Sequence, residues 1–361
     1  MSASSFFAAD YPEARGLFLD AAREAGARLV HYDHPLTGPD GGALATDVAL
    51  LGAEDAPLAL VLSSATHGVE GFCGSGCQVG FLKSGLAGDL PEGIRLVLVH
   101  AHNPHGFAHI RRVTEDNIDL NRNFIDFAAG LPDNPAYDGV HDWLVPADWD
   151  GPARAAVETE IAAFIEQHGQ FAWQAAVTGG QYRHADGLFY GGQAPSWSRR
   201  TIERLAGEHL GDCRAVGLID FHTGLGPRGH GEVIGIGAPG TAMFERARAW
   251  YGDEARSPEA GDSVSAVVTG TVEQGYEAAL PGVALTGIAI EYGTLPPTDV
   301  LDALRADNWL HLYGDVDSPQ GREIKQQMRA AFYGEDDTWK DMVWERACDV
   351  VDRAARGLAE G

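Results

Sequence analysis

Basic residues are scarce in this sequence, which has 26 Lys and Arg residues against 52 Asp and Glu residues and a formal net charge of −26. A chain this acidic repels phosphate, so binding to nucleic acid or to an anionic membrane surface is not expected. Long apolar runs are missing too, since no stretch approaches the roughly 20 apolar residues that a membrane helix needs. The charge predicts a solvated acidic surface and leaves open a salt-adapted host or a preference for cationic substrates.

Cysteine is also sparse, with four residues in 361 and no CxxC pair. A disulfide framework is therefore not expected, and this pattern is typical of a protein in a reducing cytoplasm. The first residues lack the basic and long apolar regions of a secretory signal. A GxSxG motif beside a predicted strand and a GxxxxGK motif are absent as well, which argues against a serine hydrolase and a P-loop nucleotidase.

Apolar residues make up 45% of the chain, enough for a large core. Apolar runs of strand length lie at 58–62, 95–101, 215–221 and 283–291. Helical patterns lie at 10–24, where Asp10 and Glu13 form a predicted capping box, and at 70–83, 152–168, 242–251, 299–311 and 338–357. Strands that alternate with helices predict an α/β fold. We expect a single domain over 1–361 with an insertion-rich segment around 130–192, whose role the sequence leaves open.

The motif HGVEG follows directly on the first apolar run. Its His67 and Glu70 lie three residues apart at a predicted strand-to-helix turn, where both can reach one ion. The motif DFHTGLG adds His222 at the end of another predicted strand. Two imidazoles, one carboxylate and an open position form the ligand set of a catalytic zinc, and sites of α/β sheets gather beyond the carboxyl ends of strands. Each motif is weak alone, because a lone His more often packs in a core or bonds its own loop.

Charged residues in three further motifs complete the candidate site. Glu291 in IEYGT closes the last apolar run; facing the ion, it can take a proton from water and return it to a leaving amine. Asn121 and Arg122 in IDLNRNF offer donors that suit a carboxylate. Either Arg111 or Arg112 in NPHGFAHIRRV can stabilise a developing oxyanion. The alternatives are a solvated strand end for the glutamate and a salt-bridged surface loop for the arginines.

In combination, these motifs resemble the zinc carboxypeptidase superfamily, the carboxypeptidase A-like enzymes. The blocks HGVEGF, NPHGFAHIRR, DLNRNF, DGLFYGG and EYGT are similar to an uncharacterised bacterial branch described only as a domain of unknown function. The resemblance implies a mixed, mainly parallel twisted sheet of about eight strands between helical layers. It also implies one zinc ion per chain, held by His67, Glu70 and His222.

The same resemblance implies roles for the other residues. Glu291 becomes the general base, and Arg112, slightly preferred over Arg111, becomes the oxyanion arginine. Asn121 and Arg122 bind the terminal carboxylate of the substrate, and Arg111 is assigned to substrate binding beside them.

We therefore predict a cytoplasmic zinc hydrolase that acts on peptide or other amide bonds. Its predicted substrate is a small peptide or an acyl amino acid with a free carboxylate. An N-acyl amino acid deacylase of the aspartoacylase type and an inactive relative that binds peptide ends are the alternatives. The sequence leaves open the physiological substrate, the native metal and the oligomeric state.

Overall fold

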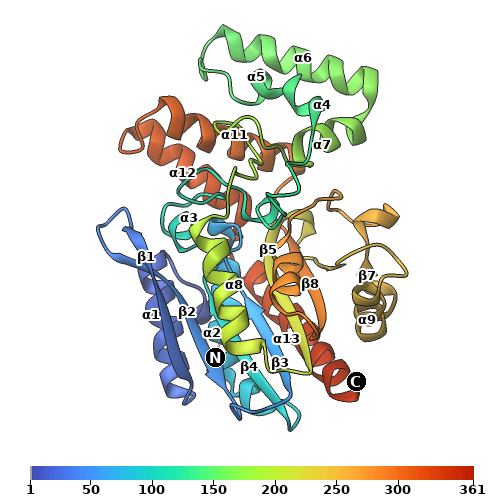
Figure 1. The fold of residues 1–361 in the computed structure, drawn as a ribbon. Helices are drawn as coiled ribbons and strands as arrows, with labels where there is room; N and C mark the ends of the chain where they lie inside the picture. The colour runs from blue at the N-terminus through green and yellow to red at the C-terminus, as the bar shows by residue number, and fades with distance from the viewer. Residues whose placement is uncertain (1) are drawn as a thin grey trace.

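An eight-stranded sheet forms the centre of the computed structural model, which describes residues 2–361 (Figure 1). Its strands are β1 (Arg28–Thr37), β2 (Ala43–Leu51), β3 (Leu58–Ser63), β4 (Ile94–His100), β5 (Ala215–Arg228), β6 (Gly231–Gly235), β7 (Ala255–Arg256) and β8 (Ala284–Gly293). Their order across the sheet is β1-β2-β4-β3-β5-β8-β6-β7.

The four middle strands β4, β3, β5 and β8 run parallel, whereas β2 and β6 join them antiparallel on either side. Every residue of β3 and β4 is buried, because helices cover both faces of the sheet. Such strands read as continuous apolar runs, which is why the sequence showed them clearly. The prediction of a mixed, mainly parallel sheet of about eight strands between helical layers is confirmed.

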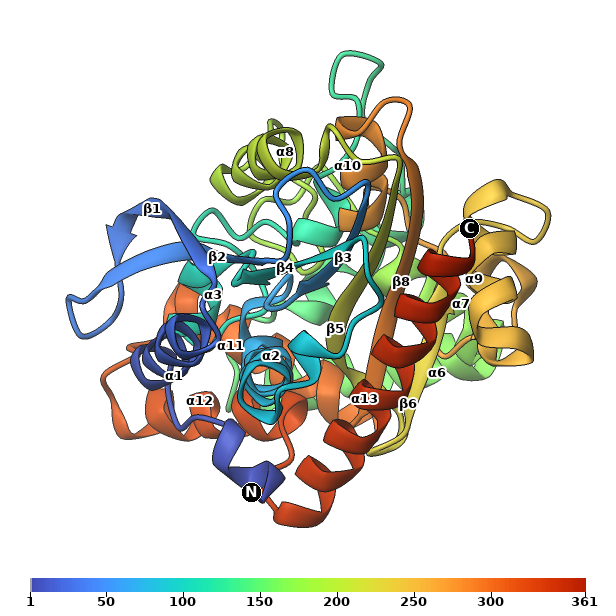
Figure 2. The same cartoon turned by 90° about the horizontal axis from the view of Figure 1, so that it is seen from below.

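Helices form a layer on each face of the sheet (Figure 2). The longer helices are α1 (Tyr11–Glu24), α2 (Gly71–Ser84), α6 (Pro152–His168), α7 (Gln170–Thr178), α8 (Trp197–Leu210), α9 (Ala242–Tyr251), α10 (Val272–Ala279), α11 (Pro297–Tyr313), α12 (Pro319–Phe332) and α13 (Asp337–Glu360). The short helices are α3 (Pro104–Ala108), α4 (Pro135–Asp138) and α5 (His141–Leu144). One apolar core joins α1, α2 and α13 to the sheet, and a second joins α8 and α10 to its other face.

The segment from α4 to α7 lies above the carboxyl ends of the parallel strands (Figure 1). It shares an apolar cluster with α11 and α12, in which Tyr137 and Trp173 are buried together with Met328 and Phe332. We call helices α4–α7 the cap. Over residues 2–361 no helix is both long and apolar enough to cross a bilayer. The cap is thus anchored to the helices beside the sheet and stands over the strand ends where we expect the site.

Candidate metal centre and active site

Two parallel strands bring the three predicted metal ligands together. His67 follows β3 and leads through a 3₁₀ turn, Gly68–Glu70, into α2. His222 lies in β5, which pairs with β3 as far as Asp220. A Cβ on Gly68 would lie 2.1 Å from the carbonyl carbon of Gly106, so only glycine lets the turn pass this close to the backbone of α3.

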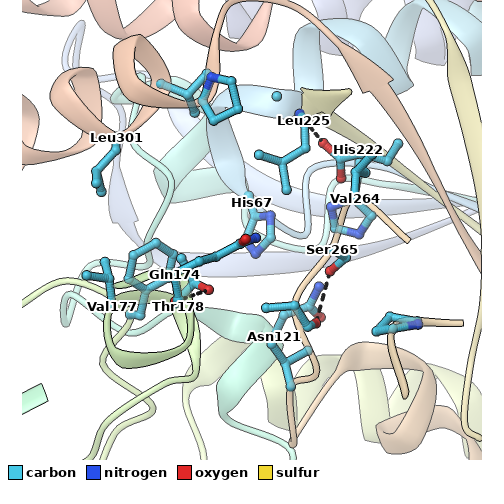
Figure 3. Close-up of a pocket in the computed structure, with 18 of the residues that line it drawn as sticks. His67, Asn121, Gln174, Val177, Thr178, His222, Leu225, Val264, Ser265 and Leu301 are labelled. Atoms are coloured by element: carbon cyan, nitrogen blue, oxygen red, sulfur yellow. Dashed lines mark hydrogen bonds between the residues drawn. The ribbon is translucent and has the colours of Figure 1, made fainter. Parts of the chain in front are cut away.

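The carboxylate of Glu70 lies between the two imidazoles. Nδ1 of His67 is 2.8 Å from Oε1 of Glu70, and Nδ1 of His222 is 2.8 Å from Oε2. All three side chains are buried, with at most 4% of any residue exposed. One ligand atom from each lies within 4.8 Å of the others, so a single ion can reach all three. Figure 3 shows the two imidazoles facing the same space.

Two buried aspartates hold the far nitrogens of these imidazoles. Nε2 of His67 is 3.2 Å from Oδ1 of Asp119, and Nε2 of His222 is 2.7 Å from Oδ2 of Asp220. When Nε2 donates its proton to a carboxylate, the lone pair remains on Nδ1 and faces the centre. Sequence reasoning did not assign these aspartates a role. Each aspartate precedes a predicted site residue by two positions, in DLNRNF and DFHTG. That spacing was the one sequence feature that could have pointed to them.

The donor set fits a divalent cation. Burial alone would raise the pKa of Glu70 and lower that of His222. The opposite happens: His67 and His222 lower the pKa of the carboxyl, and Asp220 and Glu70 raise the pKa of the His222 imidazole. An ionised carboxylate such as Glu70 can only accept hydrogen bonds, and a divalent cation between it and the two Nδ1 atoms can take the place of the N–H groups at these short contacts. Two imidazoles, one carboxylate and two outer carboxylates match the ligand chemistry of zinc.

A cavity of about 630 Å³ adjoins this centre and is lined by all three candidate ligands. Arg112 also lines it, and its guanidinium contacts Glu70 at 3.3 Å and Asp119 at 3.1 Å. Arg111 lies outside this cavity, because its guanidinium contacts Asp307 at 3.2 Å and Asn117 at 3.1 Å. The two neighbouring arginines thus face in different directions, and Arg112 is the one beside the metal centre.

Arg122 and Asn121 lie together at the cavity wall. Arg122 is 4% exposed, and its Nη1 and Nη2 donate to the carbonyl oxygens of Asn121 (2.9 Å) and Thr178 (2.6 Å). Its Nε has no hydrogen-bond partner within residues 2–361, and burial lowers the pKa of the guanidinium. Among the ion pairs of residues 2–361 none includes Arg122. A buried guanidinium with spare donors and no ion-pair partner suits the carboxylate of a ligand.

Glu291 lies next to His222 across the pairing of β5 with β8. Its Oε1 accepts a hydrogen bond from the backbone N–H of Leu225 at 2.9 Å, and its side chain lines the cavity. Burial raises the pKa of Glu291 to about 7, and the negative charge of Glu70 adds to the effect. A carboxyl with this pKa can both accept and return a proton near neutral pH.

The cap contributes one wall of the cavity. Ile161 and Ile165 of α6 line it together with Trp173 and Val177 of α7. Figure 3 shows Val177 and Thr178 on one side of the cavity and Val264 and Ser265 on the other. The segment around 130–192, which had no assigned role at the level of sequence, therefore shapes the space available to a substrate.

Several solved structures are similar to this chain. Carboxypeptidase A from Helicoverpa armigera matches 89% of this chain and 73% of its own, with 12% identity and a TM-score of 0.44. Succinylglutamate desuccinylase from Chromobacterium violaceum matches 87% and 72%, with 16% identity and a TM-score of 0.37. The ectoine utilization protein EutE (DoeB) from Ruegeria pomeroyi, in a product-bound structure, matches 79% and 67%, with 16% identity and a TM-score of 0.37.

A search of curated proteins finds no match. The family model described as "Protein of unknown function (DUF2817)" matches residues 7–346, which is most of the chain. This match confirms the resemblance to an uncharacterised branch that the motifs indicated. The chain therefore belongs to the DUF2817 family.

Proposed function

We propose that this protein is a zinc-dependent hydrolase that cleaves an amide bond next to a substrate carboxylate. One observation carries the proposal: a buried centre of His67, Glu70 and His222 shares a cavity with the buried guanidinium of Arg122, which has no ion-pair partner in the described part of the chain. The first feature suits a Lewis acid and the second suits an anionic end of a substrate. The four cysteines are free thiols, which supports a location in the reducing cytoplasm.

The chain's own residues perform the remaining steps of this proposed reaction. His67, Glu70 and His222 would hold a divalent cation, which would supply Lewis acidity at this end of the cavity. Asn121 and Arg122 bind the substrate carboxylate and orient the amide. Glu291 takes a proton from the attacking water and later passes it to the leaving nitrogen. Arg112 stabilises the negative charge that develops on the carbonyl oxygen.

A pair of substrates tests the role of the carboxylate. The first is an N-acylated dipeptide with a free carboxyl terminus, and the second is the same compound with a carboxyl-terminal amide. Because a hydrogen-bonded charged pair is worth about 1.5–3 kcal/mol, the free acid should have a kcat/KM about 10- to 100-fold higher. Equal hydrolysis of the two compounds would contradict the role of Arg122. Zinc-loaded protein that cleaves neither, nor any simple N-acyl amino acid, would contradict the proposed function itself.

Simple N-acyl amino acids in the same panel address the alternative of a deacylase. They carry the same carboxylate but an acyl group in place of a peptide. Faster cleavage of these compounds than of acylated dipeptides would identify a deacylase with the same metal chemistry and the same residue roles.

A further inference from the structure

Glu273 is a buried carboxylate that the proposed reaction does not use. It lies in the first turn of α10, is 1% exposed and lines the cavity. Among the described residues, neither of its carboxylate oxygens has a hydrogen-bond partner. A buried polar group without a partner costs free energy, and a buried charge costs more. A carboxylate kept in this state at a cavity wall is consistent with a partner that arrives with the substrate.

The wall that carries Glu273 is continuous with the residues proposed to bind the substrate carboxylate. Oδ1 of Asn121 accepts a hydrogen bond from the backbone N–H of Val272 at 2.9 Å. Glu273 is the next residue along the helix. On the other side its Cβ and Cγ lie against β8, where a Cβ on Gly287 would be 3.2 Å from both atoms. A ligand whose carboxylate reaches Asn121 therefore has Glu273 beside it on the same wall.

Other groups near Glu273 do not satisfy it. Asp220 and His222 each have a ligand atom within 4.8 Å of one of its oxygens. Asp220 is itself negative and already accepts hydrogen bonds from Ser63 and Thr66, both at 2.6 Å. Nε2 of His222 is directed to Asp220 at 2.7 Å. Two carboxylates, Asp220 and Glu273, thus face a single imidazole, and this excess of negative charge favours a cationic ligand.

The rim of the cavity also carries negative charge. The exposed residues Glu259 and Asp299 line it, and neither takes part in an ion pair among the described residues. The chain as a whole has a net charge of −26. Such a field attracts cationic groups toward the opening. It would disfavour a substrate whose only charge is its carboxylate.

We propose that Glu273 is a specificity residue that binds a side-chain ammonium or guanidinium of the substrate. The cation belongs to the same residue whose carboxylate Asn121 and Arg122 bind, so the preferred substrate ends in a basic amino acid. The inference rests on the proposed function, whose leaving group it identifies as a lysine-like or arginine-like amino acid. It also predicts that the free basic amino acid binds without any turnover.

Binding of free amino acids tests the inference apart from catalysis. The side chain of L-norleucine matches that of L-lysine as far as Cε and lacks only the terminal ammonium. On zinc-loaded protein, L-lysine should raise the Tm at concentrations at least tenfold below those needed with L-norleucine. Glu273→Gln should bring the two within about twofold, whereas Glu259→Gln, the same change at the rim, should keep the difference. Equal effects of both amino acids on the wild-type protein would overturn the proposal even if the variant does not fold.

Kinetics separate a specificity role from a supporting role behind His222. With acylated dipeptides that end in Lys or norleucine, Glu273→Gln should lower kcat/KM for the Lys substrate at least tenfold, mainly through KM. The norleucine substrate should change less than threefold, and the zinc content should stay the same. An equal loss of kcat for both substrates, or loss of zinc, would overturn the proposal and make Glu273 a support for His222. If L-lysine binds selectively while neither substrate is cleaved, the proposed function fails and the binding site stands.

Discussion

Asp119→Asn should weaken zinc binding while the fold is retained. The carboxylate of Asp119 contacts Nε2 of His67 at 3.2 Å, Nε of Arg112 at 3.1 Å and the backbone N–H of Asn121 at 3.0 Å. Asparagine has the same shape and keeps one acceptor oxygen. It removes the negative charge that favours the Nε2–H form of His67, and it leaves Arg112 with Glu70 as its remaining ion-pair partner.

The size of the effect follows from the place of Asp119 behind a ligand. Loss of such a partner costs about 10- to 100-fold in metal affinity, which is about 1.4–2.8 kcal/mol. Arg112 is half-buried, so the solvent screens part of its lost pairing. We therefore expect the metal-free variant to lose no more than about 1.5–3 kcal/mol of unfolding free energy, the value of one charged hydrogen bond.

A titration against a chelating fluorophore of known zinc affinity measures the effect. Asp116→Asn is the matched control, because Asp116 lies three residues away, is exposed and makes no side-chain hydrogen bond to any described residue. The control should bind zinc like the wild-type protein. A Kd for Asp119→Asn within twofold of the control would refute the role assigned to the outer carboxylate.

Three more substitutions test the proposed general base Glu291, the buried ion pair of Asp307 and the turn at Gly68 between the candidate ligands. Glu291→Gln should lower kcat by about 10²- to 10⁴-fold, with the zinc content by mass spectrometry unchanged. Burial raises the pKa of Asp307, but Lys325 at 2.6 Å and a neighbouring arginine more than offset this and hold it below its ordinary value. Asp307→Asn should therefore cost about 3–5 kcal/mol in urea unfolding at pH 7. The cost should shrink as the pH falls below about 3.9, where Asp307 gains a proton in the unfolded wild-type chain while the folded carboxyl stays ionised to lower pH. Gly68→Ala should cost about 1–3 kcal/mol and weaken zinc binding, whereas Gly88→Ala, with nothing within 4 Å of the added Cβ, should do neither.

Each of these changes has an outcome that contradicts its reasoning. A loss of zinc in Glu291→Gln would make this residue a ligand and not a base. A stability difference for Asp307→Asn that stays constant down to pH 2 would show that the pairing with Lys325 contributes little. Equal behaviour of the two glycine variants would show that the turn at Gly68 has room to adapt.

Buried elements were predictable from the sequence because burial on both faces leaves a continuous apolar run. The strand at 58–62 and the helices at 152–168 and 242–251 appear with nearly the same bounds in the structure. The edge strand β1 was not predicted, because most of its residues are exposed or half-buried and polar residues interrupt it. β5 continues past the predicted end at 221, since its pairing with β8 resumes after an irregularity at Gly224.

The site was predictable where a motif places its residues at strand ends. His67, Glu70 and His222 come together as expected, and Glu291 and Arg112 lie beside them. The separation of Arg112 from Arg111 was not predictable, because it depends on Asp307, which is 196 residues away in the chain. The roles of the cap and of Glu273 could not be predicted from the sequence for the same reason. Their sequences carry no motif, and only tertiary packing brings them to the cavity.

Metal content tests the central claim most directly. Wild-type protein purified with zinc available should carry about one zinc per chain by mass spectrometry, and so should His230→Ala, a control at an exposed histidine. His67→Ala and His222→Ala should each carry almost none while remaining folded by circular dichroism. Retention of the wild-type zinc content in either variant, or absence of zinc from the wild-type protein, would contradict a metal centre at these residues.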